Sequence, residues 1–334
     1  MRKIGLLFLC LVQLSCTGQV MEKINGVSFV GSREKVTQQQ VDAVVGINAG
    51  YAAVMPFGFI RDLHSPDIVF DTDRQWYGET RRGAKQYIQL LQKNGIEVML
   101  KPQIWIWRGE FTGGLKMGSE EDWKALEASY DAFILTYAKL AEETNTKLLC
   151  IGTELEQFVK NRPQYWKTLI KKIRVVYQGK LTYAANWDEY PRTSFWDELD
   201  YIGIDAYFPL SEEKTPTIEQ LKAGWRPHKE RISLLSETMN KPVLFTEFGY
   251  RSMDYTAKKP WLVDQNQMAV NFEGQVNAKK AIFEEFWTED WFAGGFVWKW
   301  FIDHKNAGGD TCNRFTPQNK PAEDVLQQYF NRYR

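Results

Sequence analysis

Residues 147–155 read KLLCIGTEL, and residues 242–250 read PVLFTEFGY. In both stretches an apolar run ends on a glutamate, Glu154 in the first and Glu247 in the second. Short, nearly continuous apolar runs are typical of strands buried on both faces, as in a parallel sheet. Because a buried carboxylate without a partner is costly, two strands that end in this way need either an ion pair or a chemical role to explain them.

Six more apolar runs of this kind occur along the chain, and stretches with helical spacing separate most of them. The eight predicted strands cover residues 24–31, 51–59, 97–105, 147–154, 181–187, 201–207, 242–249 and 292–300. The predicted helices cover residues 37–45, 80–93, 120–143, 163–177, 218–239, 267–287 and 321–330. Only the step between the fifth and sixth strands lacks a long helical pattern.

This alternation predicts parallel strands joined by right-handed crossovers. Eight strands in this arrangement match a closed (β/α)8 barrel, the TIM barrel, which a chain of 334 residues is long enough to form. A doubly wound open sheet is the competing architecture, but it usually carries a glycine-rich phosphate-binding turn, which the sequence lacks. We therefore predict one catalytic TIM-barrel domain over residues 22–334, with its active site at the carboxyl ends of the strands.

The composition excludes several classes of function. Lys plus Arg and Asp plus Glu both total 42, so the formal net charge is zero and nothing indicates a nucleic-acid partner. The three histidines and four cysteines show no ligand spacing, so we expect no metal, and no motif indicates a cofactor. Aromatic residues make up 14% of the chain. They fit either a large aromatic core or a cleft in which sugar faces stack on flat rings.

The N-terminus reads as a targeting segment within residues 1–18. Arg2 and Lys3 precede a short apolar stretch, and Cys16 follows a small residue. This pattern predicts a lipoprotein signal peptide cleaved before Cys16, which would then carry the acyl chains of a membrane anchor. Gln13 departs from that pattern, and ordinary cleavage near Gly18 is the alternative. We expect a monomer in the cell envelope, lipid-anchored at the outer membrane or cell surface, or secreted if Cys16 is not lipidated.

Two carboxylates that face each other at one end of a barrel suit the cleavage of a glycosidic bond. One carboxyl must be protonated to donate to the leaving oxygen, and the other must be ionised to attack the anomeric carbon or to activate water. A separation of about 5 to 5.5 Å favours the retaining, double-displacement route. Because neighbouring like charges move two pKa values apart, one site can hold both forms. The expected partner is a polysaccharide or oligosaccharide substrate.

The chain resembles glycoside hydrolase clan A, and within it family 113, over about residues 24–330. The stretches that carry the resemblance are Gly152-Thr153-Glu154-Leu155, Thr246-Glu247-Phe248-Gly249-Tyr250, Lys101-Pro102, Asp205-Ala206-Tyr207 and Trp298-Lys299-Trp300. The resemblance implies a retaining endo-β-1,4-mannanase with Glu154 as acid/base and Glu247 as nucleophile. Thr153 departs from the asparagine that many clan members place before the acid/base, although its hydroxyl can still bond a sugar.

The resemblance also implies roles for residues at other strand ends. Clan members commonly place a tryptophan after strand eight as the floor of the cleavage subsite, which favours Trp298 over Trp300. A tyrosine near the end of strand six often bonds the nucleophile, which indicates Tyr207. Asp205 shares the face of Tyr207. It is expected either to contact sugar or to form a core ion pair with Lys101.

Four further residues are candidates for sugar binding. Asn186 and Trp187 end the fifth predicted strand, where an amide beside a ring suits a sugar contact. Trp105, together with Trp107, follows the third strand and offers rings as outer sugar platforms, with plain packing as the alternative.

Other functions remain open on sequence alone. A β-1,4-glucanase or another β-glycosidase would use the same pair of glutamates. A non-catalytic sugar-binding barrel on the cell surface would keep the aromatic residues but lose a carboxylate, and both carboxylates are present. A metal-dependent hydrolase would need histidines at strand ends, where none of the three lies.

Overall fold

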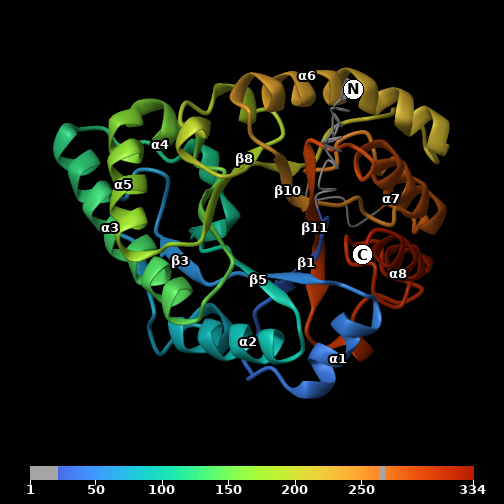
Figure 1. Cartoon of the computed structure of the whole chain (residues 1–334), viewed down its shortest axis with the longest axis horizontal. Helices are drawn as coiled ribbons and strands as arrows, with labels where there is room; N and C mark the ends of the chain where they lie inside the picture. Colours follow the sequence, from blue (N-terminus) through green and yellow to red (C-terminus); the bar gives the residue numbers. More distant parts are fainter. Residues whose placement is uncertain (1–21, 263–267) are drawn as a thin grey trace, which may run out of the picture.

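The computed structural model describes residues 22–262 and 268–334. The predicted signal peptide and Cys16 lie outside these residues. Eight parallel strands close into a barrel in the order β1-β11-β10-β9-β8-β7-β5-β2, and β2 pairs with β1 (Figure 1). These strands are Ile24–Val30 (β1), Tyr51–Val54 (β2), Glu97–Leu100 (β5), Leu148–Thr153 (β7), Lys180–Asn186 (β8), Ile202–Ala206 (β9), Val243–Phe248 (β10) and Phe292–Phe301 (β11). The predicted TIM barrel is confirmed.

Helices surround the barrel, as Figure 1 shows. They are Gln38–Gly46 (α1), Arg81–Lys93 (α2), Glu120–Glu143 (α3), Glu156–Asn161 (α4), Pro163–Val176 (α5), Ile218–Met239 (α6), Phe272–Phe286 (α7) and Pro321–Arg332 (α8). The short helix α4 was not predicted. The link from β8 to β9 holds two short 3-10 turns at Tyr190–Arg192 and Trp196–Glu198 instead of a long helix, as the sequence indicated.

Two predicted strands were too long. The sequence predicted unbroken strands over residues 51–59 and 97–105, but each divides at a proline, Pro56 and Pro102. A proline has no N–H group to donate to a neighbouring strand. The segments beyond the prolines, Phe57–Ile60 (β3) and Gln103–Ile106 (β6), leave the barrel and form a three-stranded sheet with Val69–Phe70 (β4), in the order β4-β3-β6.

The core has two parts. Small and medium-sized side chains fill the barrel together with Phe296, which lies so close to Gly26 that a Cβ there would come within 2.4 Å of its ring. The larger part lies between the strands and the helices, where stacked and edge-on aromatic pairs are frequent. Cys150 is a buried free thiol. Much of the aromatic content therefore serves packing.

Candidate active site

Strands β5, β7, β9 and β10 bring four ionisable residues to one end of the barrel. Lys101 follows β5 and Glu154 follows β7. Asp205 and Glu247 are the second-last residues of β9 and β10. In a parallel barrel these carboxyl ends all open on the same side, where active sites of this fold lie.

Glu247 accepts hydrogen bonds at both carboxylate oxygens. Its Oε1 atom accepts from the Nζ of Lys101 and from the Nε2 of Gln103, the latter at 3.0 Å. Its Oε2 atom accepts from the hydroxyl of Tyr207 at 2.7 Å. The expected bond from Tyr207 is therefore present. Donors aimed at a carboxylate favour its ionised form.

Lys101 also forms an ion pair with Asp205. Its Nζ lies 3.3 Å from each oxygen of Asp205, and both side chains are almost completely buried. Burial alone would lower the pKa of Lys101, but the charges of Asp205 and Glu247 hold it well above its usual range. Burial and the charge of Glu247 raise the pKa of Asp205 to about 7, although Lys101 and a bond from Thr246 oppose this rise. The core ion pair was one of the two roles expected for Asp205.

Glu154 lies in a different environment. Its backbone has a φ of 50°, in the left-handed region that only a few non-glycine residues adopt. Its N–H donates to the carbonyl of Ala184 at 2.8 Å, which ties the turn to the neighbouring strand. Burial raises the pKa of the Glu154 carboxyl well above its usual range, and the charges of Asp205 and Glu247 raise it further against the opposing effect of Lys101. Both effects favour the protonated form of this carboxyl.

Two predicted sugar contacts end strands next to Glu154. The hydroxyl of Thr153 is buried and lies beside the thiol of Cys150. Asn186 uses its side-chain oxygen to accept from the N–H of Trp187 at 2.9 Å, and its own N–H donates to Glu189 at 3.1 Å. The roles of Thr153 and Asn186 in sugar binding stay predictions.

The predicted aromatic platforms differ in exposure. Trp300 is completely buried and lies 5.4 Å from the ring of His304, whereas Trp298 keeps part of its surface open. Trp105 is half exposed. Trp187 stacks on Trp261 with ring centroids 4.9 Å apart. Of the two tryptophans that end β11, only Trp298 is thus open to a substrate.

Two residues near Glu247 were not predicted. Gln103 was missed because the sequence placed it in the middle of one long strand. In the structure it is instead the first residue of β6, directly after Pro102. Lys299 lies between the predicted tryptophans, with its ammonium 5.2 Å from the Trp298 ring and 5.0 Å from the Phe301 ring. Burial lowers the pKa of Lys299, the charge of Glu247 opposes this, and the charge of Arg314 adds to it. A polar residue just beyond an apolar run was the only sequence signal for Gln103.

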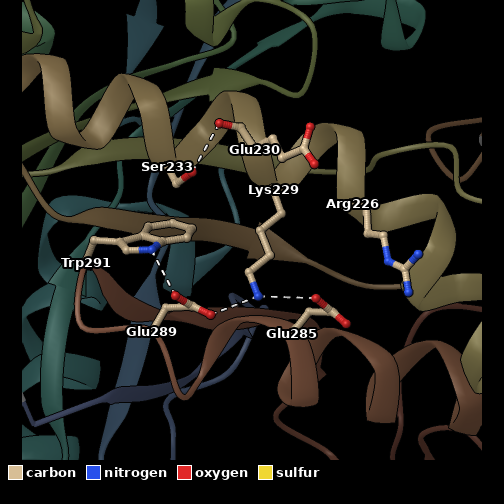
Figure 2. A pocket seen from close by; sticks show the side chains of 7 residues that line it. All are labelled: Arg226, Lys229, Glu230, Ser233, Glu285, Glu289 and Trp291. Atoms are coloured by element: carbon tan, nitrogen blue, oxygen red, sulfur yellow. Dashed lines mark hydrogen bonds and ion pairs between the residues drawn. The ribbon is translucent and has the colours of Figure 1, made fainter.

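A separate hollow lies at the opposite end of the barrel, between α6 and α7 beside the start of β11 (Figure 2). There Lys229 pairs with Glu285 at 3.2 Å and with Glu289 at 2.8 Å, and the Trp291 indole donates to Glu289 at 3.1 Å. These groups satisfy one another far from Glu247. Within residues 22–262 and 268–334 no cluster of His, Cys, Asp and Glu could hold a metal ion. No helix in the same ranges is long and apolar enough to cross a membrane.

Known proteins share this fold and the family pattern. A model of Glycoside Hydrolase Family 113 matches residues 30–320. The family 113 β-mannanase of Alicyclobacillus acidocaldarius, in complex with ManMIm, has a TM-score of 0.82 and 23% identity, covering 94% of this chain and 99% of that one. A family 113 β-1,4-mannanase complex has a TM-score of 0.81 and 24% identity, covering 93% and 99%. Comparison with the curated proteins found no match.

A more distant likeness is the β-glucuronidase of Faecalibacterium prausnitzii, with a TM-score of 0.59 and 17% identity, covering 88% of this chain and 45% of that one. The identities to all these structures are low, so they establish the shared barrel. The match over residues 30–320 spans all eight barrel strands except most of β1. The chain therefore belongs to glycoside hydrolase family 113, a family of glycoside hydrolases.

Proposed function

We propose that this protein hydrolyses β-1,4-linked mannan or glucomannan with retention of configuration, with Glu154 as acid/base and Glu247 as nucleophile. The observation that carries this proposal is the contrast between the two carboxyls. Burial and nearby negative charge raise the pKa of Glu154 and so favour its protonated form, whereas three donors bond to Glu247. An acid and a nucleophile are the two forms that a retaining glycosidase needs.

The reaction then follows in two steps. Glu154 gives its proton to the glycosidic oxygen while Glu247 attacks the anomeric carbon, so that the bond to the leaving sugar breaks and a glycosyl ester forms. The ionised Glu154 next takes a proton from water, and the oxygen of that water attacks the anomeric carbon and releases Glu247. Lys101, Gln103 and Tyr207 hold Glu247 in place before the first step and after the second.

The choice of mannan is supported by the family and by the names of the two family 113 neighbours. The test is to express residues 19–334 and measure reducing-sugar release from β-1,4-mannan, glucomannan and carboxymethylcellulose. We expect manno-oligosaccharides from the first two substrates. Activity on carboxymethylcellulose alone would keep the mechanism and replace the substrate by β-1,4-glucan. Binding without any release would indicate a non-catalytic sugar-binding barrel.

The roles of the two glutamates need separate variants. Glu154→Gln and Glu247→Gln are both expected to lose more than about 10³-fold in kcat, since each removes a reacting group. Glu156→Gln is the matched control, because Glu156 lies two residues from Glu154 on α4 but pairs with Arg192 at 2.5 Å. Full activity of either Glu154→Gln or Glu247→Gln would refute its assigned role.

The stereochemistry can be followed with an activated aryl glycoside and azide. In Glu154→Ala, azide should attack the glycosyl ester on Glu247 and give the β-glycosyl azide. In Glu247→Ala, azide should attack in place of the nucleophile and give the α-glycosyl azide. The reverse pair of products would exchange the two roles. An inverted first product from the unmodified enzyme would replace retention by inversion.

We also propose that the full-length protein is held at the cell envelope by acyl chains on Cys16. The support is the sequence alone: a short apolar stretch followed by Ser15 and Cys16. Metabolic labelling with a fatty acid should label the full-length protein and leave Cys16→Ser unlabelled and released from the membrane fraction. A labelled Cys16→Ser variant, or an unlabelled full-length protein, would contradict the anchor.

A further inference from the structure

The three-stranded sheet β4-β3-β6 is separate from the barrel sheet, and its two faces differ in burial. One face is part of the core. Ile104 and Ile106 of β6 are buried, and Phe70 of β4 packs edge-on against Phe133 of α3 at 5.3 Å. A Cβ at Gly58 of β3 would meet Phe133 at 3.0 Å. This face therefore rests on α3, which holds the sheet rigidly.

The opposite face carries apolar side chains that nothing in the described residues covers completely. The register pairs Phe57 with Gln103 and Phe59 with Trp105, and it places Val69 opposite Phe59. Paired residues in a sheet project to the same side, and alternate residues share a face. Trp105 is 49% exposed and Val69 55% exposed, while both phenylalanines are half-buried. We call Phe57, Phe59, Val69 and Trp105 the open face.

The open face begins at the catalytic centre. Gln103 lies on it, and the amide of Gln103 donates to Glu247 at 3.0 Å. Trp105 follows two residues later, about 7 Å farther along the strand. A turn at Gly109, with a φ of 73°, brings the backbone against the Trp105 indole, because a Cβ there would lie 3.6 Å from its ring. One edge of the indole thus contacts the backbone near Gly109, while the rest of the ring stays open to solvent.

We propose that the open face is a glycan-binding platform that continues the active site outward from Glu247. Trp105 and Phe59 are the rings on which the apolar faces of successive sugar units stack. This inference rests on the proposed function. It assigns to the sheet the binding of those sugar units of the glycan substrate that lie beyond the cleaved bond.

The chemistry of the open face fits a sugar chain. Its four side chains carry no charge, and its rings are flat and rigid, which gives contact area at little cost in conformational entropy. Gln103 joins this apolar surface to the polar groups around Glu247 without a break. A long β-linked glycan bound at Glu247 extends out of the site on both sides of the cleaved bond. The sheet lies on one of these sides and offers it uncharged, apolar rings.

The experiment measures binding by calorimetry, in a Glu154→Gln background that does not consume the ligand. The probes are hexasaccharides of β-1,4-linked mannose, glucose and xylose, and the disaccharide of whichever sugar binds. The variants are Trp105→Ala, Phe59→Ala and Trp105→Phe. Trp291→Ala is the matched control, because it removes an indole at the other end of the barrel (Figure 2). Circular dichroism confirms the fold of each variant.

We expect Trp105→Ala to weaken hexasaccharide binding about tenfold, as loss of one aromatic contact does. The disaccharide should change less than about twofold, Trp105→Phe should recover most of the affinity, and Trp291→Ala should bind normally. Equal hexasaccharide affinity in Trp105→Ala and its parent would overturn the platform. Binding of a glucan or xylan chain that still depends on Trp105 would keep the platform and replace the proposed sugar. No binding of any hexasaccharide would overturn both.

Discussion

Glu154 and Glu247 occupy equivalent positions, each at the carboxyl end of a barrel strand, yet their surroundings are opposite. Three side chains donate hydrogen bonds to the Glu247 carboxylate. Within the described part of the chain no residue donates to the carboxyl of Glu154, whose pKa is raised mainly by burial. The same residue type in the same place on the fold thus has two different environments, because donors surround the Glu247 carboxylate and burial dominates at Glu154.

The donors of Glu247 come from two elements. Lys101 and Gln103 flank Pro102, where the chain leaves the barrel, and Tyr207 follows β9. The chain around Pro102 therefore supplies two of the three hydrogen bonds to the Glu247 carboxylate, and both of these reach Oε1. Removing these donors one at a time should make the surroundings of Glu247 more like those of Glu154, and the activity should fall with each loss.

The largest effect is expected for Lys101→Met. This change leaves Asp205 and Glu247 buried without their shared cation, which typically costs about 3 to 5 kcal/mol of folding free energy. We expect kcat to fall by about 10³-fold, since the nucleophile loses its charged partner. Because the charge of Lys101 lowers the pKa of Asp205, loss of Lys101 should raise that pKa and move the acidic limb of the pH–activity profile to higher pH. Urea unfolding and a pH profile measure the two effects.

A second variant separates the charge of Lys101 from its structural role. Lys101→Met combined with Asp205→Asn removes one carboxylate along with the cation, so much of the lost stability should return. The activity should stay low, because Glu247 still lacks its cation. Recovery of activity together with stability would show that Lys101 serves the fold alone.

A smaller effect is expected for Tyr207→Phe. The change removes one hydrogen bond to Oε2 of Glu247 and leaves those of Lys101 and Gln103 at Oε1. A bond to a charged group is worth about 1.5 to 3 kcal/mol, so kcat should fall by about 10- to 100-fold. Tyr250→Phe is the control, because the buried hydroxyl of Tyr250 donates to the carbonyl of Phe208 at 3.0 Å. Equal losses in both variants would assign the effect of Tyr207 to folding.

The barrel itself could be predicted because strand ends and helix spacing are local properties of the sequence. The predicted strands over residues 242–249 and 292–300 differ from β10 and β11 only at their ends. The strands over residues 51–59 and 97–105 were wrong because apolar residues continue beyond Pro56 and Pro102 while the hydrogen-bonded partners change. A run of apolar residues indicates that a segment is buried, but it does not indicate which sheet that segment joins.

The candidate site could be predicted in part for the same reason. Glu154 and Glu247 were found because each ends an apolar run, whereas Tyr207 was found through the family resemblance and Asp205 because it shares the face of Tyr207. Gln103 was not found, since its bond to Glu247 depends on the path of the chain after Pro102. The raised pKa of Glu154 also lay beyond the sequence, because it follows from burial and from the charges that long-range packing brings near this carboxyl.

The smallest effect is expected at a third carboxylate, Glu189, and it is an effect on stability. Glu189 accepts hydrogen bonds as Glu247 does, and burial raises its pKa as it does at Glu154. It accepts from the Tyr183 hydroxyl at 2.7 Å and from the N–H of Asn186 at 3.1 Å, yet burial raises its pKa from 4.5 to about 7. Between about pH 4.5 and pH 7 the Glu189 carboxyl is therefore protonated in the folded protein and ionised in the unfolded chain. Its contribution to stability is complete below about pH 4.5 and is lost as the pH rises through 7.

Glu189→Gln removes this titration while keeping the shape of the side chain. Between pH 5 and pH 7 the unfolding free energy of the unmodified protein should therefore fall by about 1 to 2 kcal/mol more than that of the variant. Asp205, whose pKa is also raised to about 7, titrates in both proteins and cancels in the difference. Urea unfolding at the two pH values measures this difference. Parallel losses would mean that the two donors outweigh burial at Glu189, so that its carboxyl titrates alike in the folded and unfolded protein.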